Sequence, residues 1–225
     1  SRSLAPAAWL MSQTPAETLD IARWADANGW YGVWYADHYM PNTGTSERKT
    51  GDTHEVWAIL PAIAAVTERV RIGPLVTPTS VHHPAVLANR AVTIDHLSNG
   101  RMVLGLGAGW QINEHEAYGI ELEAPGRRVT RFEESIQIIR SLLANDRTTF
   151  DGSVFTITDA PCEPKPLQSP LPIVVGTGSP RMSRITAQHA DEWNTWGTVE
   201  EAGRRRATFA EACEPTRHES AQCLC

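Results

Sequence analysis

Short apolar runs alternate with longer amphipathic stretches along this chain of 225 residues. The short runs are rich in β-branched and aromatic residues and are too brief for helices, so they predict strands. The predicted strands span 31–36, 71–76, 102–106, 171–176 and 191–195. The predicted helices span 14–29, 54–68, 84–99, 131–145, 180–189 and 199–212. Strands that alternate with helices indicate an α/β fold with a parallel sheet covered by helices.

The clearest helix signal opens the first helix. Thr14 stands at the N-cap position, Pro15 at the first helical position, and Glu17 completes a capping box. Gly29 marks the end of the same helix, where glycine tolerates the left-handed conformation that closes a last turn. These signals predict a helix of about four turns at the start of the chain.

Two architectures satisfy this alternation, an open doubly wound sheet and a closed (β/α)8 TIM-type barrel. A dinucleotide-binding sheet carries its glycine fingerprint after the first strand and an acidic residue at the end of the next strand. Here the glycine-rich stretch 105–110 follows the third predicted strand, and no such acid appears. The sequence therefore favours the barrel.

Polar or glycine-rich groups follow four of the predicted strands. They are Asp37-His38, Thr77-Pro78-Thr79, Gly107-Ala108-Gly109 and Gly176-Thr177-Gly178-Ser179. In a barrel of this type the carboxyl ends of all strands meet at one rim, where functional groups gather. We therefore expect these four segments to converge on one site.

Composition narrows the class of protein. The net charge of −6 and the scattered basic residues give no surface for a nucleic acid, and the triplet 204–206 is typical of a solvated helix face. No apolar run is long enough to span a membrane and no leader opens the chain, so we expect a cytoplasmic protein without a membrane partner. The four cysteines fit neither a zinc spacing nor a disulfide framework, and neither His-Glu pair has metalloprotease spacing, so no metal site is expected.

Three stretches resemble the luciferase-like monooxygenase superfamily, specifically its coenzyme F420-dependent oxidoreductase branch. They are "GVWYADHYMP", "IGPLVTPTSVHHPAVLANRAVTIDHLSNGRMVLGLGAGWQINEHEAYGI" and "LPIVVGTGSPR". The resemblance runs from about Thr14 to Trp196, and the long middle block makes it specific. It implies a (β/α)8 barrel that binds a deazaflavin or a flavin at the carboxyl-terminal rim and acts on a small-molecule substrate.

The resemblance also implies roles for residues on the rim. The backbone of Gly107, Ala108 and Gly109 corresponds to a phosphate-binding turn, where missing side chains let N–H groups approach an anion. A plain turn into the next helix is the alternative. Trp110 is expected to pack against the cofactor or to wall the substrate pocket.

A second glycine turn follows the strand at 171–176. Gly176, Thr177, Gly178 and Ser179 resemble the family's second phosphate-side turn, with Arg181 as a counter-charge. Capping of the next helix by Ser179 is an equally good interpretation.

The expected reaction centre lies on the first two of these strand ends. His38 corresponds to a histidine that the family places beside the reactive ring, and Asp37 could fix the orientation of its imidazole. Val76 and Thr77 follow the strand in which the family carries a bulge with a non-proline cis peptide under the cofactor ring. His82 and His83 precede Pro84 and are expected to serve the helix start or substrate access.

Departures from the family patterns bear on cofactor and substrate. Bacterial luciferases carry an arginine where this chain has Ala108, so we expect coenzyme F420 to bind more tightly than FMN. An FMN-dependent monooxygenase is the alternative function. Trp110 and Asn42 stand where the sugar-phosphate dehydrogenases carry a glutamate and a tryptophan, so that substrate is not expected.

The chain is expected to form one domain over 1–225, with an irregular tail at 210–225. The segment "APAAWLM" is a doubtful first strand, and the family continues for two more strand-helix units after the helix at 199–212. We therefore expect an incomplete barrel that aggregates or forms a homo-oligomer, because open strand edges seek partners. A truncated, non-catalytic fragment is the alternative to an enzyme.

Overall fold

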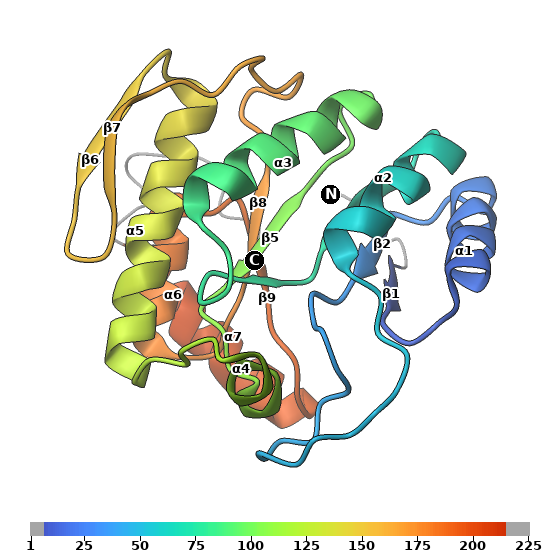
Figure 1. The fold of residues 1–225 in the computed structure, drawn as a ribbon, viewed down its shortest axis with the longest axis horizontal. Coiled ribbons are helices and arrows are strands. Elements are labelled where there is room, and N and C mark those ends of the chain that lie inside the picture. The colour runs from blue at the N-terminus through green and yellow to red at the C-terminus, as the bar shows by residue number, and fades with distance from the viewer. Residues whose placement is uncertain (1–6, 215–225) are drawn as a thin grey trace.

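The computed structural model describes residues 7–214, and its strands form one curved parallel layer flanked by helices (Figure 1). The strands of this layer are β1 (Ala7–Leu10), β2 (Gly32–Tyr35), β3 (Arg71–Pro74), β4 (Thr77–Pro78), β5 (Leu104–Gly107), β8 (Ile173–Gly176) and β9 (Glu192–Asn194). The helices are α1 (Pro15–Ala27), α2 (Val56–Val66), α3 (Pro84–Leu97), α4 (Ile112–Tyr118), α5 (Pro125–Ala144), α6 (Pro180–His189) and α7 (Val199–Cys213).

The parallel strands run in the order of a β/α barrel. One sheet has the order β1-β2-β3, and a second has the order β4-β5-β8-β9. The two sheets meet where Ile72 of β3 bridges Met102, and the amide of Val103 donates to the carbonyl of Ile72 at 2.9 Å. The helices that follow these strands contact one another in the same sequence, α1 with α2, α2 with α3, α3 with α5, α5 with α6 and α6 with α7.

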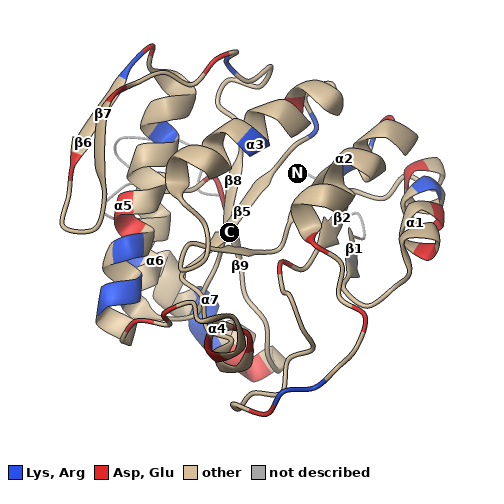
Figure 2. Ribbon diagram, viewed as in Figure 1, with Lys and Arg blue, Asp and Glu red and all other residues tan. Residues whose placement is uncertain are grey.

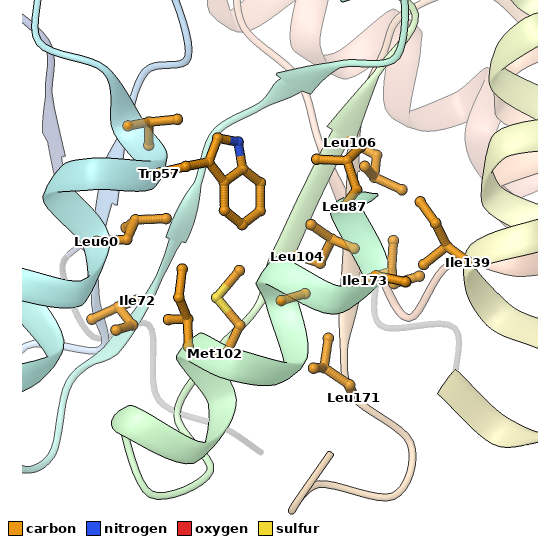
Figure 3. Close-up of a cluster of buried hydrophobic side chains, with 14 of the residues drawn as sticks. Trp57, Leu60, Ile72, Leu87, Met102, Leu104, Leu106, Ile139, Leu171 and Ile173 are labelled. Atoms are coloured by element: carbon orange, nitrogen blue, oxygen red, sulfur yellow. The ribbon is translucent and has the colours of Figure 1, made fainter. Parts of the chain in front are cut away.

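Strand residues alternate between two hydrophobic clusters. Leu104 and Leu106 of β5 belong to the larger cluster between the strands and the helices. Figure 3 shows side chains of α2, α3 and α5 packed there against the strands, among them Trp57, Leu87 and Ile139. Val103 belongs to a smaller cluster with Trp34 and Val174. The odd-numbered positions of β5 therefore face the inside of the curved sheet, and Gly105 and Gly107 lie on that face.

The structure confirms most of the predicted elements. The capping box of Thr14 and Glu17 opens α1, His83 is the N-cap of α3, and α6 spans the predicted residues. The doubtful segment before α1 is a strand, because 7–10 pairs in parallel with 32–35 along its whole length. The strand predicted at 71–76 ends at Pro74, and a separate short strand, β4, begins at Thr77. The peptide bond between Leu75 and Val76 is cis.

Three segments differ from the prediction. Residues 148–160 form an antiparallel hairpin of β6 (Thr148–Asp151) and β7 (Thr156–Ala160), which lies along α5 in Figure 1. The short helix α4 follows β5 and was not predicted separately. The expected irregular tail is wrong at its start, because α7 continues to Cys213, while 215–225 lies outside the described residues.

Charged residues lie on helices and loops rather than on the central strands. Figure 2 shows β2, β5 and β8 without acidic or basic positions, as their sequences require. Within residues 7–214, no helix has the length and apolar character needed to cross a bilayer.

Candidate active site

A cavity of about 720 Å³ opens at the carboxyl ends of the strands. Its volume lies within the usual range of small-molecule and cofactor sites. The walls come from the segments that follow β2, β3, β4, β5, β8 and β9, together with one residue each of α4 and α6. The lining residues are His38, Leu75, Val76, Pro78, Gly107, Ala108, Gly109, Trp110, Glu114, Gly176, Thr177, Gly178, Ser179, Met182, Asn194, Thr195 and Trp196.

The predicted convergence of strand ends is therefore present. Most residues proposed from the sequence as part of the site line this cavity. The exceptions are Asp37, Thr77, Thr79, His82, His83 and Arg181. Sequence reasoning missed Glu114 on α4, Met182 on α6 and the segment 194–196 after β9. A strand was predicted at 191–195, and the carboxyl end of every barrel strand belongs to the same rim. The segment 194–196 could therefore have been predicted as part of the site.

His38 lies in the cavity wall and is held by a buried carboxylate. Its Nδ1 atom is 2.9 Å from Oε1 of Glu114, and the Glu114 side chain is only 2% exposed. The other oxygen of Glu114 accepts a hydrogen bond from the backbone N–H of Tyr39 at 2.9 Å. With Glu114 ionised, Nδ1 carries the proton that it donates, and Nε2 is the ring nitrogen left for a ligand.

Asp37 does not orient His38, in contrast to the sequence-based expectation. Its Oδ2 atom accepts hydrogen bonds from Thr77 Oγ1 at 2.7 Å and from Trp57 Nε1 at 3.2 Å. His82 Nε2 lies 3.0 Å from the same oxygen. Successive residues at a strand end point to opposite sides, so Asp37 is buried behind the rim while His38 faces the cavity.

The expected role of Thr77 as a cofactor contact is also not supported by its position. The Thr77 side chain is fully buried, and its hydroxyl is engaged by Asp37. Val76 lines the cavity instead, directly before β4. The backbone at 75–77 thus presents the side chain of Val76 to the cavity and anchors Thr77 behind it.

Val76 packs against two glycines of neighbouring strands. A β-carbon added to Gly107 would lie 2.8 Å from Cγ2 of Val76, and one added to Gly176 would lie 3.2 Å from both Val76 methyl carbons. Larger residues at these positions would force Val76 to move. The glycines leave an apolar floor formed by Val76 between β5 and β8.

The turn at 107–109 is held from outside the cavity. Nη1 of Arg128 on α5 donates to the carbonyl oxygen of Gly109 at 2.6 Å. Gly109 has φ of +89°, and a β-carbon there would lie 2.1 Å from Oγ of Ser80. Ser80 is fixed in turn by His115, whose Nε2 lies 2.9 Å from Oγ. Arg128 therefore brings a positive charge to the turn that has Ala108 in place of an arginine.

The second glycine turn also has a cation, but a different one from that expected. Arg181 points away, because its guanidinium binds Gly126, Thr130 and Glu133. Arg205 of α7 lies against Gly178, where an added β-carbon would be 2.7 Å from its Nε.

Arg205 is fixed by residues of the cavity wall. It donates to Oγ1 of Thr195 at 3.3 Å and to the carbonyl oxygen of Trp196, and its guanidinium lies 5.7 Å from the Trp196 ring centroid. The expectation that residues 204–206 are only a solvated face is thus wrong for Arg205. Ser179 is the N-cap residue of α6, but its side chain makes no capping bond.

Two tryptophans expose large ring surfaces at the cavity. Trp110 is 49% exposed and Trp196 is 61% exposed, and both line the cavity. The ring of Trp110 meets His38 edge-on, with 5.8 Å between the ring centroids. Tyr39 directly follows His38 and is half-buried. Its burial, together with the nearby carboxylates of Asp37, Glu55 and Glu114, raises the pKa of the Tyr39 hydroxyl, so this group stays protonated.

A metal ion is not suggested by the arrangement of donors. Over the part of the chain that the structure describes, no three histidine, cysteine, aspartate or glutamate side chains gather in a metal-binding geometry. Cys162 is a buried free thiol, and Cys213 is also buried. The chemistry of the cavity thus depends on an imidazole paired with a carboxylate, on glycine turns backed by arginines, and on apolar walls.

The fold is thus a parallel β/α barrel, and its cavity lies at the carboxyl rim, where TIM-barrel enzymes have their active sites. The family model of the luciferase-like monooxygenases matches residues 3–222. The chain belongs to this family.

Two curated relatives have names of F420-dependent enzymes. The chain is 36% identical over 180 residues to the F420-dependent glucose-6-phosphate dehydrogenase of Amycolatopsis mediterranei, covering 79% of this chain and 52% of the relative. It is 33% identical over 178 residues to the enzyme of the same name from Kineococcus radiotolerans, covering 79% and 51%. The chain thus spans about half the length of these curated relatives.

Solved structures confirm the fold. An F420-dependent secondary alcohol dehydrogenase, solved with an F420-acetone adduct, superposes with a TM-score of 0.82 at 24% identity, covering 93% of this chain and 63% of that one. The F420-dependent tetrahydromethanopterin reductase of Methanopyrus kandleri superposes with a TM-score of 0.81 at 18% identity, covering 94% and 61%. At these identities the likeness concerns the fold alone, and it confirms the barrel predicted from the sequence.

Proposed function

We propose that this chain binds coenzyme F420 and moves a hydride between it and a small organic substrate. The observation that carries the proposal is that two glycine turns, each backed by an arginine, share one cavity with His38. The names of the relatives in the F420-dependent branch support the choice of cofactor.

The residues present fit such a cofactor. The glycine turns at 107–109 and 176–178 remove side chains from two adjacent strand ends, where a phosphate can approach the backbone. Arg128 and Arg205 supply positive charge behind these turns. Leu75 and Val76 give an apolar surface for a flat ring, and the cavity volume of about 720 Å³ leaves room beside it.

When bound, coenzyme F420 supplies a ring carbon that accepts or gives a hydride. The remaining change in a two-electron oxidation is one proton, which leaves the substrate. Nε2 of His38 is the atom that we propose to accept this proton, and it returns the proton in the reverse direction. Glu114 keeps Nδ1 as the donor nitrogen and compensates the positive charge of the protonated ring. Val76 and Trp110 give the cavity apolar walls beside the reacting atoms.

The cofactor proposal is tested by parallel titrations with F420 and with FMN. We expect the dissociation constant for F420 to be at least tenfold lower than that for FMN. Tighter or equal binding of FMN would reverse the assignment, and the absence of binding by either compound would refute the proposal for this chain.

The role of His38 is tested by His38→Ala. We expect turnover to fall by about 10²-fold or more, with F420 affinity kept within several-fold, because general acid-base catalysis contributes on this scale. His54→Ala is the matched control, since His54 is a histidine outside the cavity wall. A parallel loss of cofactor affinity in His38→Ala would identify a binding contact instead.

A further inference from the structure

We propose that the His38 end of the cavity selects an uncharged substrate with an apolar or aromatic body, and that Trp110 is the residue that determines this specificity. The inference rests on the proposed function, since it names the substrate class of the same site. It is carried by the position and exposure of Trp110 and by the charges of the described lining residues.

The reacting atom of any substrate has to lie near His38. A proton donor or acceptor works over a hydrogen-bond distance of about 3 Å, so the substrate must approach the imidazole directly. Trp110 packs edge-on against that imidazole, with 5.8 Å between centroids. A molecule at hydrogen-bond distance from the imidazole therefore lies close to the indole ring.

The indole ring of Trp110 is not buried in the protein core but exposes part of its surface to the cavity. Nearly half of the residue is exposed, and it lines the cavity. Exposed tryptophan in a concave site is typical of recognition surfaces, because the large ring gains from burial by a ligand. A ligand with an apolar or aromatic body buries more apolar surface against this ring than a polyol does, because the polyol's hydroxyl groups also need hydrogen-bond partners.

The charge of the lining excludes an anion at this end. Among the described lining residues, the titratable side chains are His38 and Glu114, and the lining has no lysine or arginine. The Glu114 carboxylate lies 2.9 Å from His38. A phosphate or carboxylate beside His38 would lose its hydration next to the Glu114 carboxylate, and the lining offers no lysine or arginine to compensate it.

The two arginines near the cavity bind its glycine turns from behind. Arg128 binds the carbonyl oxygen of Gly109, and Arg205 lies against Gly178 and the Trp196 ring. Both positions belong to the glycine turns. Neither arginine is among the residues that line the cavity, so neither presents its guanidinium to a ligand beside His38.

The test compares ligands that differ in charge and share their shape. 1-Phenylethanol is a neutral aromatic alcohol, and mandelate has a carboxylate in place of its methyl group. Glucose 6-phosphate serves as an anionic polyol. Binding of each compound to the chain is measured by ligand-observed NMR without cofactor and again in the presence of F420. We expect 1-phenylethanol to bind at least tenfold more tightly than mandelate or glucose 6-phosphate.

Two variants locate the contact. Trp110→Ala should weaken binding of 1-phenylethanol about tenfold, which corresponds to about 1.4 kcal/mol. Trp24→Ala is the matched control, because Trp24 is a comparably exposed tryptophan on α1 outside the cavity wall. Circular dichroism of both variants checks that the fold is kept, and Trp110→Phe should restore most of the affinity if an aromatic surface is what matters.

The outcomes separate the two proposals. Equal or tighter binding of mandelate or glucose 6-phosphate, no binding of 1-phenylethanol, or equal affinities in the two alanine variants would overturn the assigned substrate class. If F420 fails to bind while the neutral ligand is still preferred, the proposed function fails and the selectivity of the cavity stands. If F420 binds and no charge preference appears, only the further inference fails.

Discussion

Replacing Gly105 and Gly107 by alanine should have different effects, although the two glycines lie two residues apart on β5. A β-carbon on Gly105 would lie 1.9 Å from the carbonyl oxygen of Pro74 and 3.0 Å from its carbonyl carbon. A β-carbon on Gly107 would lie 2.8 Å from a methyl carbon of Val76. The first obstacle is the backbone of a neighbouring strand, whereas the second is a side chain at the cavity surface.

The magnitudes follow from what has to move. Overpacking a core costs about 1–3 kcal/mol when side chains can adjust, and more when they cannot. For Gly105→Ala the strands themselves must separate by more than an ångström, so we expect a loss of about 3 kcal/mol or more. With about 2–4 °C per kcal/mol for a domain of this size, Tm falls by about 6–12 °C. For Gly107→Ala we expect about 1 kcal/mol, because Val76 can turn into the cavity.

Thermal unfolding followed by circular dichroism measures the first effect, and F420 titration measures the second. Gly107→Ala should raise the dissociation constant for F420 several-fold, since the displaced Val76 narrows the cavity. Gly203→Ala is the control: nothing lies within 4 Å of its added β-carbon, and alanine in a helix is worth up to about 1 kcal/mol over glycine. A Gly105→Ala variant that melts with the parent protein, or equal Tm losses at 105 and 107, would refute the reasoning.

Further predictions concern three side chains around the same framework. Glu114→Gln should lower kcat about 10–100-fold with little change in F420 affinity, because Glu114 orients the imidazole of His38. Glu116→Gln, on the exposed face of α4, is the control and should change neither kcat nor affinity. Arg205→Gln should weaken F420 binding and reduce its dependence on salt, and an unchanged salt dependence would remove this arginine from the anion site. Burial alone would raise the pKa of the Glu134 carboxyl. The hydrogen bonds from the Ser153 hydroxyl and from the backbone N–H groups of residues 153–155 lower this pKa by a larger amount, so the net pKa is below its usual range. Glu134→Gln should therefore destabilise the protein at neutral pH, and urea unfolding should show the difference shrinking as the pH falls through the depressed pKa of the folded state; a difference independent of pH would contradict this.

The repeating part of the fold could be predicted because local signals and tertiary structure agree. Apolar runs that alternate with capped helices define the order of strands, and the carboxyl ends then share one rim by geometry alone. The hairpin at 148–160 interrupts that order. The Asp151-Gly152 pair between two short apolar runs is typical of a hairpin turn. The hairpin was not predicted, because an antiparallel pair does not fit a pattern of parallel strands that alternate with helices.

The composition of the site could be predicted better than its connections. His38 and the glycine turns follow strands, so their positions at the rim were evident. The partner of His38 is 76 residues away on α4, and no spacing rule pairs it with His38 rather than Asp37. The same holds for Arg205, which reaches Gly178 only because α7 packs on α6. Side-chain partners of this kind depend on packing between helices, which local sequence does not encode.

The contact of Val76 with both Gly107 and Gly176 has a consequence for the evolution of the family. Gly107 of β5, Gly176 of β8 and Val76, between β3 and β4, share one volume beside the cavity, so these positions cannot vary in size independently. Among relatives, an alanine or serine at the position of either glycine should accompany a smaller residue at the position of Val76. Compensation of this kind would let a lineage reshape the surface beneath a bound ring without disturbing the strands that carry it.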